Sequence, residues 1–218
     1  MEYIFKHFKN PMVFYCILVL VCSVFFQACN SESGNKDPTL QLEDKGPSGS
    51  GETSPTCGHR FVDSNSSGSK DGTSWENAFT NLNDAIEDVC PGYEIWVARG
   101  TYTPGTARED HFRLKKDVIL YGGFAGTEEN LDERDFKNNK TILSCNIGDQ
   151  DVSSDNCYHV VYMDRSDTIS NSTILDGFTI TGGHADGSEH SDQWGGGIVI
   201  DRASPIIENC EIVHNYAA

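Results

Sequence analysis

The feature that most constrains the fold is a repeat near the end of the sequence. The segment Thr173–Ile180 is followed by a similar segment, Pro205–Ile212, and a second pair of similar segments, Val161–Arg165 and Ile198–Arg202, lies upstream of each copy. Short apolar strands that recur between polar turns are typical of a stacked β-solenoid, because each unit buries its apolar face against the next. The sequence therefore predicts an all-β fold built from parallel, stacked strands.

Further short apolar runs precede this repeat, and stretches rich in Asn, Asp, Gly, Ser and Thr separate them. Gly183 and Asn215 occupy the same position in the repeat, and both residue types tolerate a positive φ, so we expect a left-handed corner at each. The runs predict strands at residues 61–65, 94–98, 118–124, 141–144, 159–163, 174–181, 197–200 and 206–213.

One amphipathic helix is expected before these strands. Apolar residues between Trp75 and Val89 recur at spacings of three and four, Thr73 or Thr80 is a candidate N-cap, and Pro91-Gly92 ends the pattern. We predict that this helix caps one end of a parallel β-helix and that the other end, at Ala218, is incomplete. A β-sandwich is the alternative, although the repeat lacks hairpin Asn-Gly turns.

Residues 1–28 are organised like an export signal. Basic residues precede an uncharged apolar run, Val13–Phe26, that is short for a membrane span. The following Ala28-Cys29 resembles the end of a bacterial lipoprotein signal, so we expect a lipid on Cys29 and an exported protein anchored in the outer membrane or at the cell surface. A plain secretory signal or an uncleaved anchor is the alternative. Residues 29–58 predict a disordered tether, and residues 59–218 one domain.

Charge and cysteines narrow the setting further. The formal net charge of −17 argues against nucleic acid as a partner. An exported chain can form disulfides, and Cys145 and Cys157 flank one polar loop, so we predict a bridge between them, with two independent thiols as the alternative. Cys57 and Cys90 form a second candidate pair, and alternation with Ile212 predicts that Cys210 is a packed free thiol.

Several motifs occur together in one order along residues 61–218: Phe61-Val62-Asp63, Asp71-Gly72-Thr73-Ser74-Trp75, Glu94-Ile95-Trp96-Val97-Ala98, Leu120-Tyr121-Gly122-Gly123-Phe124, Tyr158-His159-Val160-Val161 and Leu175-Asp176-Gly177-Phe178-Thr179-Ile180. This series resembles the N-terminal part of bacterial surface proteins of the pectin-lyase-like superfamily, similar to the chlamydial polymorphic outer-membrane proteins. The resemblance implies a right-handed parallel β-helix at the cell surface. It implies no particular chemistry, because the matched motifs are mostly structural.

The candidate for a cation site is the polar loop between the two repeat copies. Two imidazoles and three carboxylates lie close together there, and side chains of these types bind divalent cations. A solvated loop is the alternative interpretation, since the spacing matches no helix-borne zinc motif and no calcium loop, and we predict no cofactor. The candidate ligands are His184, Asp186, Glu189, His190 and Asp192.

Carboxylates and aromatic residues offer two other kinds of site. Asp176, Asp201 and Glu208 could form a glycosidase pair, but they recur with the repeat, which favours solvated turn or outward positions. Arg165 and Arg202 recur after aspartates and favour salt bridges at turns. Trp194, Tyr121 and Tyr216 are candidates for stacking on sugars, whereas Trp75 and Trp96 fit the core or the cap.

Three functional hypotheses remain. The leading one is a non-catalytic surface scaffold or adhesin that binds glycans or partner proteins. The second is a polysaccharide lyase or glycoside hydrolase of the pectin-lyase-like fold, and the third is a truncated remnant of a longer surface protein. An uncapped last coil would expose unpaired backbone, so self-association through the open C-terminal end is also expected.

Overall fold

The computed structural model describes residues 58–218 and is built mainly from β-strands. The predicted signal at residues 1–28, Cys29, Cys57 and the tether before Gly58 lie outside the described residues. The strands are β1 His59–Val62, β2 Glu94–Ala98, β3 Gly100–Tyr102, β4 Phe112–Arg113, β5 Ile119–Phe124, β6 Thr141–Ser144, β7 Val161–Met163, β8 Ile174–Asp176, β9 Phe178–Thr181, β10 His184–Ala185, β11 Ile198–Ile200, β12 Ile206–Glu208, β13 Glu211–Ile212 and β14 Tyr216–Ala217. The helices are α2 Leu82–Asp88 and the short 3-10 turns η2 Leu131–Glu133, η3 Ser153–Asp155, η4 Arg165–Asp167 and η5 His190–Gln193.

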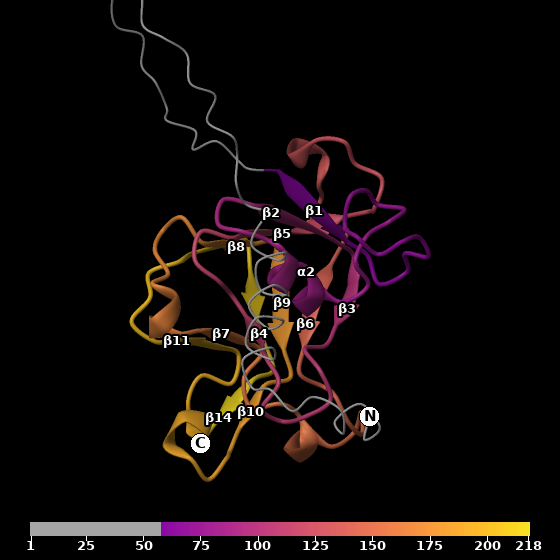
Figure 1. Ribbon diagram of the computed structural model, residues 1–218. Coiled ribbons are helices and arrows are strands. Elements are labelled where there is room, and N and C mark those ends of the chain that lie inside the picture. Colours follow the sequence, from indigo (N-terminus) through magenta and orange to yellow (C-terminus); the bar gives the residue numbers. More distant parts are fainter. Residues whose placement is uncertain (1–57) are drawn as a thin grey trace, which may run out of the picture. The chain divides into compact units, whose positions relative to one another are not determined.

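The strands form four sheets in which every pair of named strands is parallel. A five-stranded sheet has the order β1-β2-β5-β8-β12, a four-stranded sheet β13-β9-β6-β3, a three-stranded sheet β11-β7-β4 and a two-stranded sheet β10-β14. The chain visits the five-, four- and three-stranded sheets in turn, with β2, β3 and β4, and repeats this order with β5, β6 and β7 (Figure 1). Strands that are neighbours in space therefore come from successive passes of the chain.

The repeat seen in the sequence has the same register as the strand pairing. Ile206 pairs with Ile174 in the five-stranded sheet, Ile212 with Ile180 in the four-stranded sheet, and Ile198 with Val161 in the three-stranded sheet. Residues that match in sequence thus lie beside one another on adjacent strands. This pairing explains why the apolar pattern recurs, because each buried residue packs against the equivalent residue of the adjacent strand.

The corners of the repeat differ from the prediction by a few residues. Gly183 and Asn215 do not have a positive φ; the left-handed residues are the preceding pair, Gly182 (φ 82°) and His214 (φ 55°). Asn215 instead bonds through its side chain, whose Oδ1 accepts from the Gly183 N–H at 2.9 Å. The predicted strands 174–181 and 206–213 are each broken at a second corner, where Gly177 has a φ of 87° and the equivalent Asn209 a φ of 50°. Each therefore forms two strands that belong to different sheets.

The predicted helix is shorter than expected. Residues 75–79 are not helical, and α2 begins at Leu82 with Asn81 as its N-cap, whose side chain accepts from the Asn83 N–H at 2.9 Å. The earlier residues have another role, because the backbone of Phe79 bonds with Phe61 of β1 and with Asp63, which follows β1. The apolar spacing between residues 75 and 79 thus reflects packing of a turn that leads into a bridge with β1, which periodicity alone cannot distinguish from a helix turn.

Apolar side chains from the three larger sheets and from α2 form one core. Leu82, Ala85 and Ile86 of α2 are buried in it with residues such as Leu120, Leu143 and Val161. A smaller cluster unites Phe61, Ala78, Trp96 and Phe124, and Trp75 packs against it. Cys210 is a free thiol against the main core, and burial raises its pKa. Within residues 58–218, no helix is both long and apolar enough to cross a membrane.

Candidate functional site

The site that stands out lies on the outer face of the three-stranded sheet. Along β7, Val161 and Met163 are buried, so the side chain of Tyr162 between them points away from the core. Along β4, Phe112 is buried and Arg113 exposed, and the register pairs Arg113 with Tyr162. Strand alternation and parallel pairing therefore place these two side chains side by side on the surface.

An open cavity of about 300 Å³ surrounds these two residues. Four of the nine lining residues are imidazole or phenol rings and four are charged, so the cavity combines aromatic surface with polar groups. Its walls come from the chain before and within β4, from β7 and the residues flanking it, and from η5. The lining residues are Glu109, His111, Arg113, Tyr158, His159, Tyr162, Asp164, Ser191 and Asp192.

Both histidines of this cavity have the same hydrogen-bonding arrangement. Nδ1 of His111 lies 2.9 Å from the carbonyl oxygen of Glu109, and Nδ1 of His159 lies 3.3 Å from that of Gly195. A carbonyl oxygen only accepts, so in each neutral ring Nδ1 carries the proton and Nε2 is left as an acceptor. His159 is 5% exposed, and its buried Nε2 has no hydrogen-bond partner among the described residues.

Burial sets the protonation of the rings. Burial lowers the pKa of both His111 and His159, and the nearby guanidinium of Arg113 adds to the effect on His111. The pKa of Tyr162 is raised by burial and then by the carboxylates of Asp164 and Asp201, so its phenol keeps the proton. At neutral pH both imidazoles of the cavity are thus neutral and the phenol of Tyr162 is protonated.

The formal charge of the cavity is negative. Glu109, Asp164 and Asp192 contribute carboxylates, and hydrogen bonds from Ser166 lower the pKa of Asp164. Arg113 is the single guanidinium, and its Nε already donates to the Asp167 carboxylate at 3.0 Å. The positive charge of Arg113 is therefore largely neutralised by Asp167, which lies outside the cavity, whereas the three carboxylates keep the cavity negative.

The aromatic wall is held by contacts with neighbouring rings and by Arg108. The ring of Tyr162 lies between those of His111, at 4.9 Å, and His159, at 5.7 Å between centroids. The guanidinium of Arg108 lies 4.3 Å above the ring of Tyr158 and donates to the backbone oxygen of Asn156 at 2.8 Å. These contacts fix the rings in place before any ligand arrives.

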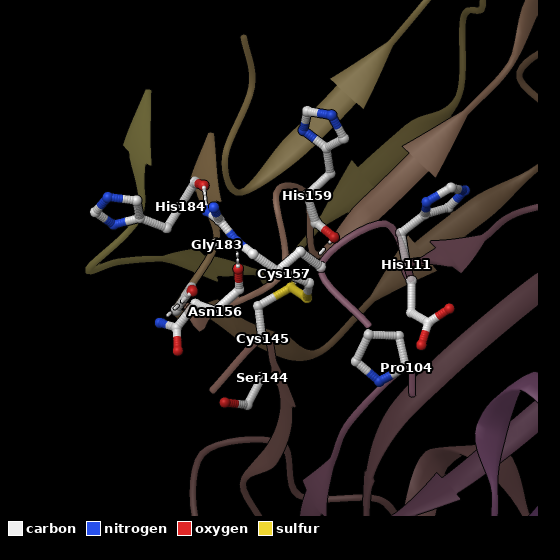
Figure 2. Close-up of a disulfide and its surroundings, with 12 residues drawn as sticks. Pro104, His111, Ser144, Cys145, Asn156, Cys157, His159, Gly183 and His184 are labelled. Carbon is white, nitrogen blue, oxygen red and sulfur yellow. Dashed lines mark hydrogen bonds between the residues drawn. A yellow bond between two sulfur atoms is a disulfide. The ribbon is translucent and has the colours of Figure 1, made fainter. Parts of the chain in front are cut away.

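A disulfide joins Cys145 and Cys157, the pair favoured by the sequence, and both residues are fully buried. Cys157 comes just before Tyr158 and His159, so the bridge anchors the chain that enters the cavity. Figure 2 shows the disulfide with His111 and His159 to one side and His184 to the other. The bridge closes the polar loop between the two cysteines and limits the motion of one wall of the site.

The five candidate metal ligands of the polar loop do not converge on one point, although Nε2 of His184 lies 3.4 Å from the carboxylate of Asp186. His184 stacks on Tyr216 at 4.7 Å, Asp186 pairs with Arg108 at 2.5 Å, and His190 packs against Trp194 at 4.1 Å. Asp192 alone among the five lines the cavity, and Glu189 is exposed. Among residues 58–218, no group of three or more His, Cys, Asp or Glu side chains is placed to hold a metal ion.

The recurring carboxylates of the repeat, Asp176, Asp201 and Glu208, each have different surroundings. Asp176 is not solvated as predicted: it is 5% exposed, forms an ion pair with Arg134 and accepts from Asn209 at 2.7 Å. The glycine-lined corner beside it lets Arg134 reach inward, which the sequence pattern does not reveal. Asp201 pairs with Arg165 at 2.8 Å, as expected for a turn, and Glu208 is exposed. These carboxylates stabilise the stack and do not form an acid–base pair.

Sequence reasoning missed His111, Glu109 and the role of His159. Nothing around His111 repeats, and β4 is only two residues long, so no strand was expected there. The pairing of Phe112 with Val161 brings His111 and His159 together from distant parts of the chain. The Tyr158-His159 motif before an apolar strand was the available signal for this site, but that His111 lies beside it could be found only from the strand register.

Comparisons with known proteins identify no relative: no family model, no curated protein and no solved structure matches this chain.

Proposed function

We propose that residues 59–218 form coils of a right-handed parallel β-helix with α2 as the cap of one end. The parallel pairing of every named strand supports this, as does the repeated order in which the chain visits the sheets. The burial of Leu82 and Ile86 against the first strands supports the role of α2 as a cap. Handedness is carried by the resemblance of the motifs at residues 61–218.

We further propose that the protein is an exported lipoprotein that acts at the cell surface as a glycan-binding scaffold or adhesin. The apolar run Val13–Phe26 followed by Cys29 supports export and lipidation. The Cys145–Cys157 disulfide fits an oxidising compartment outside the cytosol. The observation that carries the binding role is the open cavity around Tyr162, because it combines rings with hydrogen-bonding groups.

The chemistry of the cavity suits a sugar. A pyranose has one face of C–H groups, which stacks on an aromatic ring, and hydroxyl groups around its edge. Tyr162 offers the ring, and the two Nε2 atoms and the carboxylates of Glu109 and Asp192 accept hydrogen bonds from hydroxyls. A long solenoid surface with such a cavity on one face is the arrangement that repeat proteins use for extended ligands.

Isothermal titration of the full chain with a panel of oligosaccharides tests this proposal. We expect binding to at least one oligosaccharide, lost in Tyr162→Ala and retained in Tyr216→Ala, which truncates an exposed tyrosine outside the cavity. Circular dichroism of both variants checks that the fold is unchanged. Failure of every oligosaccharide to bind, or equal binding by the two variants, contradicts the proposal.

A lyase acting on acidic polysaccharides is the second candidate, and the neutral imidazoles favour it. In this reaction His111 or His159 would remove the proton beside the uronate carboxylate, and the phenol of Tyr162 would protonate the leaving oxygen. Ultraviolet absorbance of the unsaturated product formed from polygalacturonate or alginate measures it. Absence of product with both substrates leaves the binding role as the better account.

A further inference from the structure

We infer that the cavity around Tyr162 takes a sugar bearing a free, protonated amine, an inference that rests on the proposed glycan-binding function. The juxtaposition that supports it is the phenol ring of Tyr162, two acceptor imidazole nitrogens and three carboxylates within a single cavity. The candidate ligands are therefore oligomers of amino sugars that have not been acetylated. A uronate, the ligand of the lyase alternative, is disfavoured by the same features.

Charge is the first argument. Glu109, Asp164 and Asp192 face the cavity, and the one opposing charge, Arg113, is engaged by Asp167 at 3.0 Å. A uronate carboxylate would enter beside three like charges with no free cation to meet it. An ammonium group would enter a site whose electrostatic potential already favours it.

Hydrogen bonding is the second argument. With Nδ1 of each ring donating to a backbone oxygen, the Nε2 atoms of His111 and His159 can only accept. The Nε2 of His159 is buried without a partner among the described residues, so its lone pair gains most from a donor. An ammonium group provides three donors and no acceptor, which complements this wall better than an acetamide or a carboxylate does.

The aromatic ring selects an organic cation over a metal ion. Residues 58–218 present no set of three side chains that could coordinate a metal. The face of Tyr162 attracts both an ammonium group, through its π electrons, and the C–H face of the sugar ring that bears it. A sugar amine can contact the carboxylates, the Nε2 atoms and the aromatic ring together, whereas a metal ion would contact only the carboxylates.

Titration calorimetry with four matched hexasaccharides tests the inference: glucosamine, N-acetylglucosamine, glucose and galacturonate oligomers, each added to the full chain. We expect the glucosamine hexamer to bind at least about tenfold more tightly than the N-acetylated hexamer, a difference near 1.4 kcal/mol. Asp192→Asn should abolish most of that preference. Asp192 is partly exposed, so its variant should fold even if a His159 variant does not.

A matched variant separates the site from general attraction to an acidic protein. Asp132→Asn removes the same charge from an exposed residue of η2, outside the cavity, and should leave the preference unchanged. Equal effects of Asp132→Asn and Asp192→Asn, or competition by oligolysine as strong as by the glucosamine hexamer, overturn the inference. Tighter binding of the glucose or galacturonate hexamer overturns it while the glycan-binding function stands, and binding of none of the four overturns both.

Discussion

The two ends of the strand stack are built from the same kind of strand but are finished differently. At the first end, Phe61 of the edge strand β1 donates a backbone hydrogen bond to Gly72 and accepts one from Phe79, and α2 packs in the core beside it. At the last end, β11 to β14 each have one neighbouring strand among the described residues, and Ile200, Ile212 and Tyr216 are about half exposed. Strand geometry is thus the same at both ends, and the difference lies in what covers it.

The largest effect is expected where the stack buries an ion pair. Arg134 and Asp176 are 13% and 7% exposed in their side chains, so Arg134→Gln leaves a buried carboxylate without its cation and should lower the free energy of unfolding by about 4 kcal/mol. The matched pair at an exposed position is Arg165–Asp201, with side chains 57% and 29% exposed. Arg165→Gln should cost less than about 1 kcal/mol. Urea unfolding of the full chain measures both, and equal losses would contradict this difference between a buried and an exposed ion pair.

The next effect compares one isoleucine at each end. Ile86 of α2 is 1% exposed, so Ile86→Ala should lower the free energy of unfolding by about 3 kcal/mol through lost burial and a cavity. Ile212 of β13 is 53% exposed, and Ile212→Ala should change it by no more than about 0.5 kcal/mol. Thermal and urea unfolding of the two variants measure this difference. A large loss at Ile212 would show that the last end is covered in solution.

The third prediction is that the protein self-associates, with a second copy of the chain covering the last end of the stack. We propose that the exposed edge formed by β11–β14 pairs with another copy, because unpaired backbone and apolar side chains occur together there. Sedimentation should show concentration-dependent dimers that Ile212→Lys weakens by roughly tenfold or more, since the charge would be buried on association. Lys at exposed Val152, far from this edge in sequence, is the control. A monomer at high concentration in the unaltered chain would refute the proposal.

The smallest effect concerns pH and the imidazoles of the cavity. His111 is faced by Asp110, Arg113 and the Glu109 carbonyl, and His159 by His111, Asp192 and the carbonyls of Ser191 and Gly195. Because burial lowers both pKa values, the unfolded chain binds these protons first as pH falls. The stability that these neutral rings contribute is therefore complete above the ordinary histidine pKa near 6.5 and should fall as the pH drops below it. His111→Gln/His159→Gln should flatten that slope, unlike His190→Gln/His214→Gln at exposed positions.

The repeat made most of the strand framework predictable, and the reason is physical. In a parallel stack, equivalent residues of successive passes lie side by side, so similarity between residues 174–180 and 206–212 also gives the pairing register. The predicted strands 94–98 and 141–144 coincide with β2 and β6. The prediction of a helix at residues 75–79 was wrong, because an apolar spacing of three or four does not reveal whether those residues belong to a helix or pack beside the edge of a strand.

The cavity was not predictable in the same way. Repeated residues are selected by packing against their equivalents, whereas His111 and Glu109 lie in a connection that does not repeat. Their proximity to His159 follows from the two-residue strand β4, which is too short to show alternation. The polar loop drew attention by composition, but its side chains are engaged separately by Tyr216, Arg108 and Trp194, and only Ser191 and Asp192 reach the cavity.

The disulfide between Cys145 and Cys157 has a consequence for how the chain responds to a pulling force. Because neighbouring strands come from successive passes of the chain, a pulling force should detach one pass after another and not all together. The covalent bridge keeps the residues between the two cysteines from lengthening the chain as it extends. Single-molecule stretching should therefore show stepwise release in oxidised protein, with longer total extension after reduction.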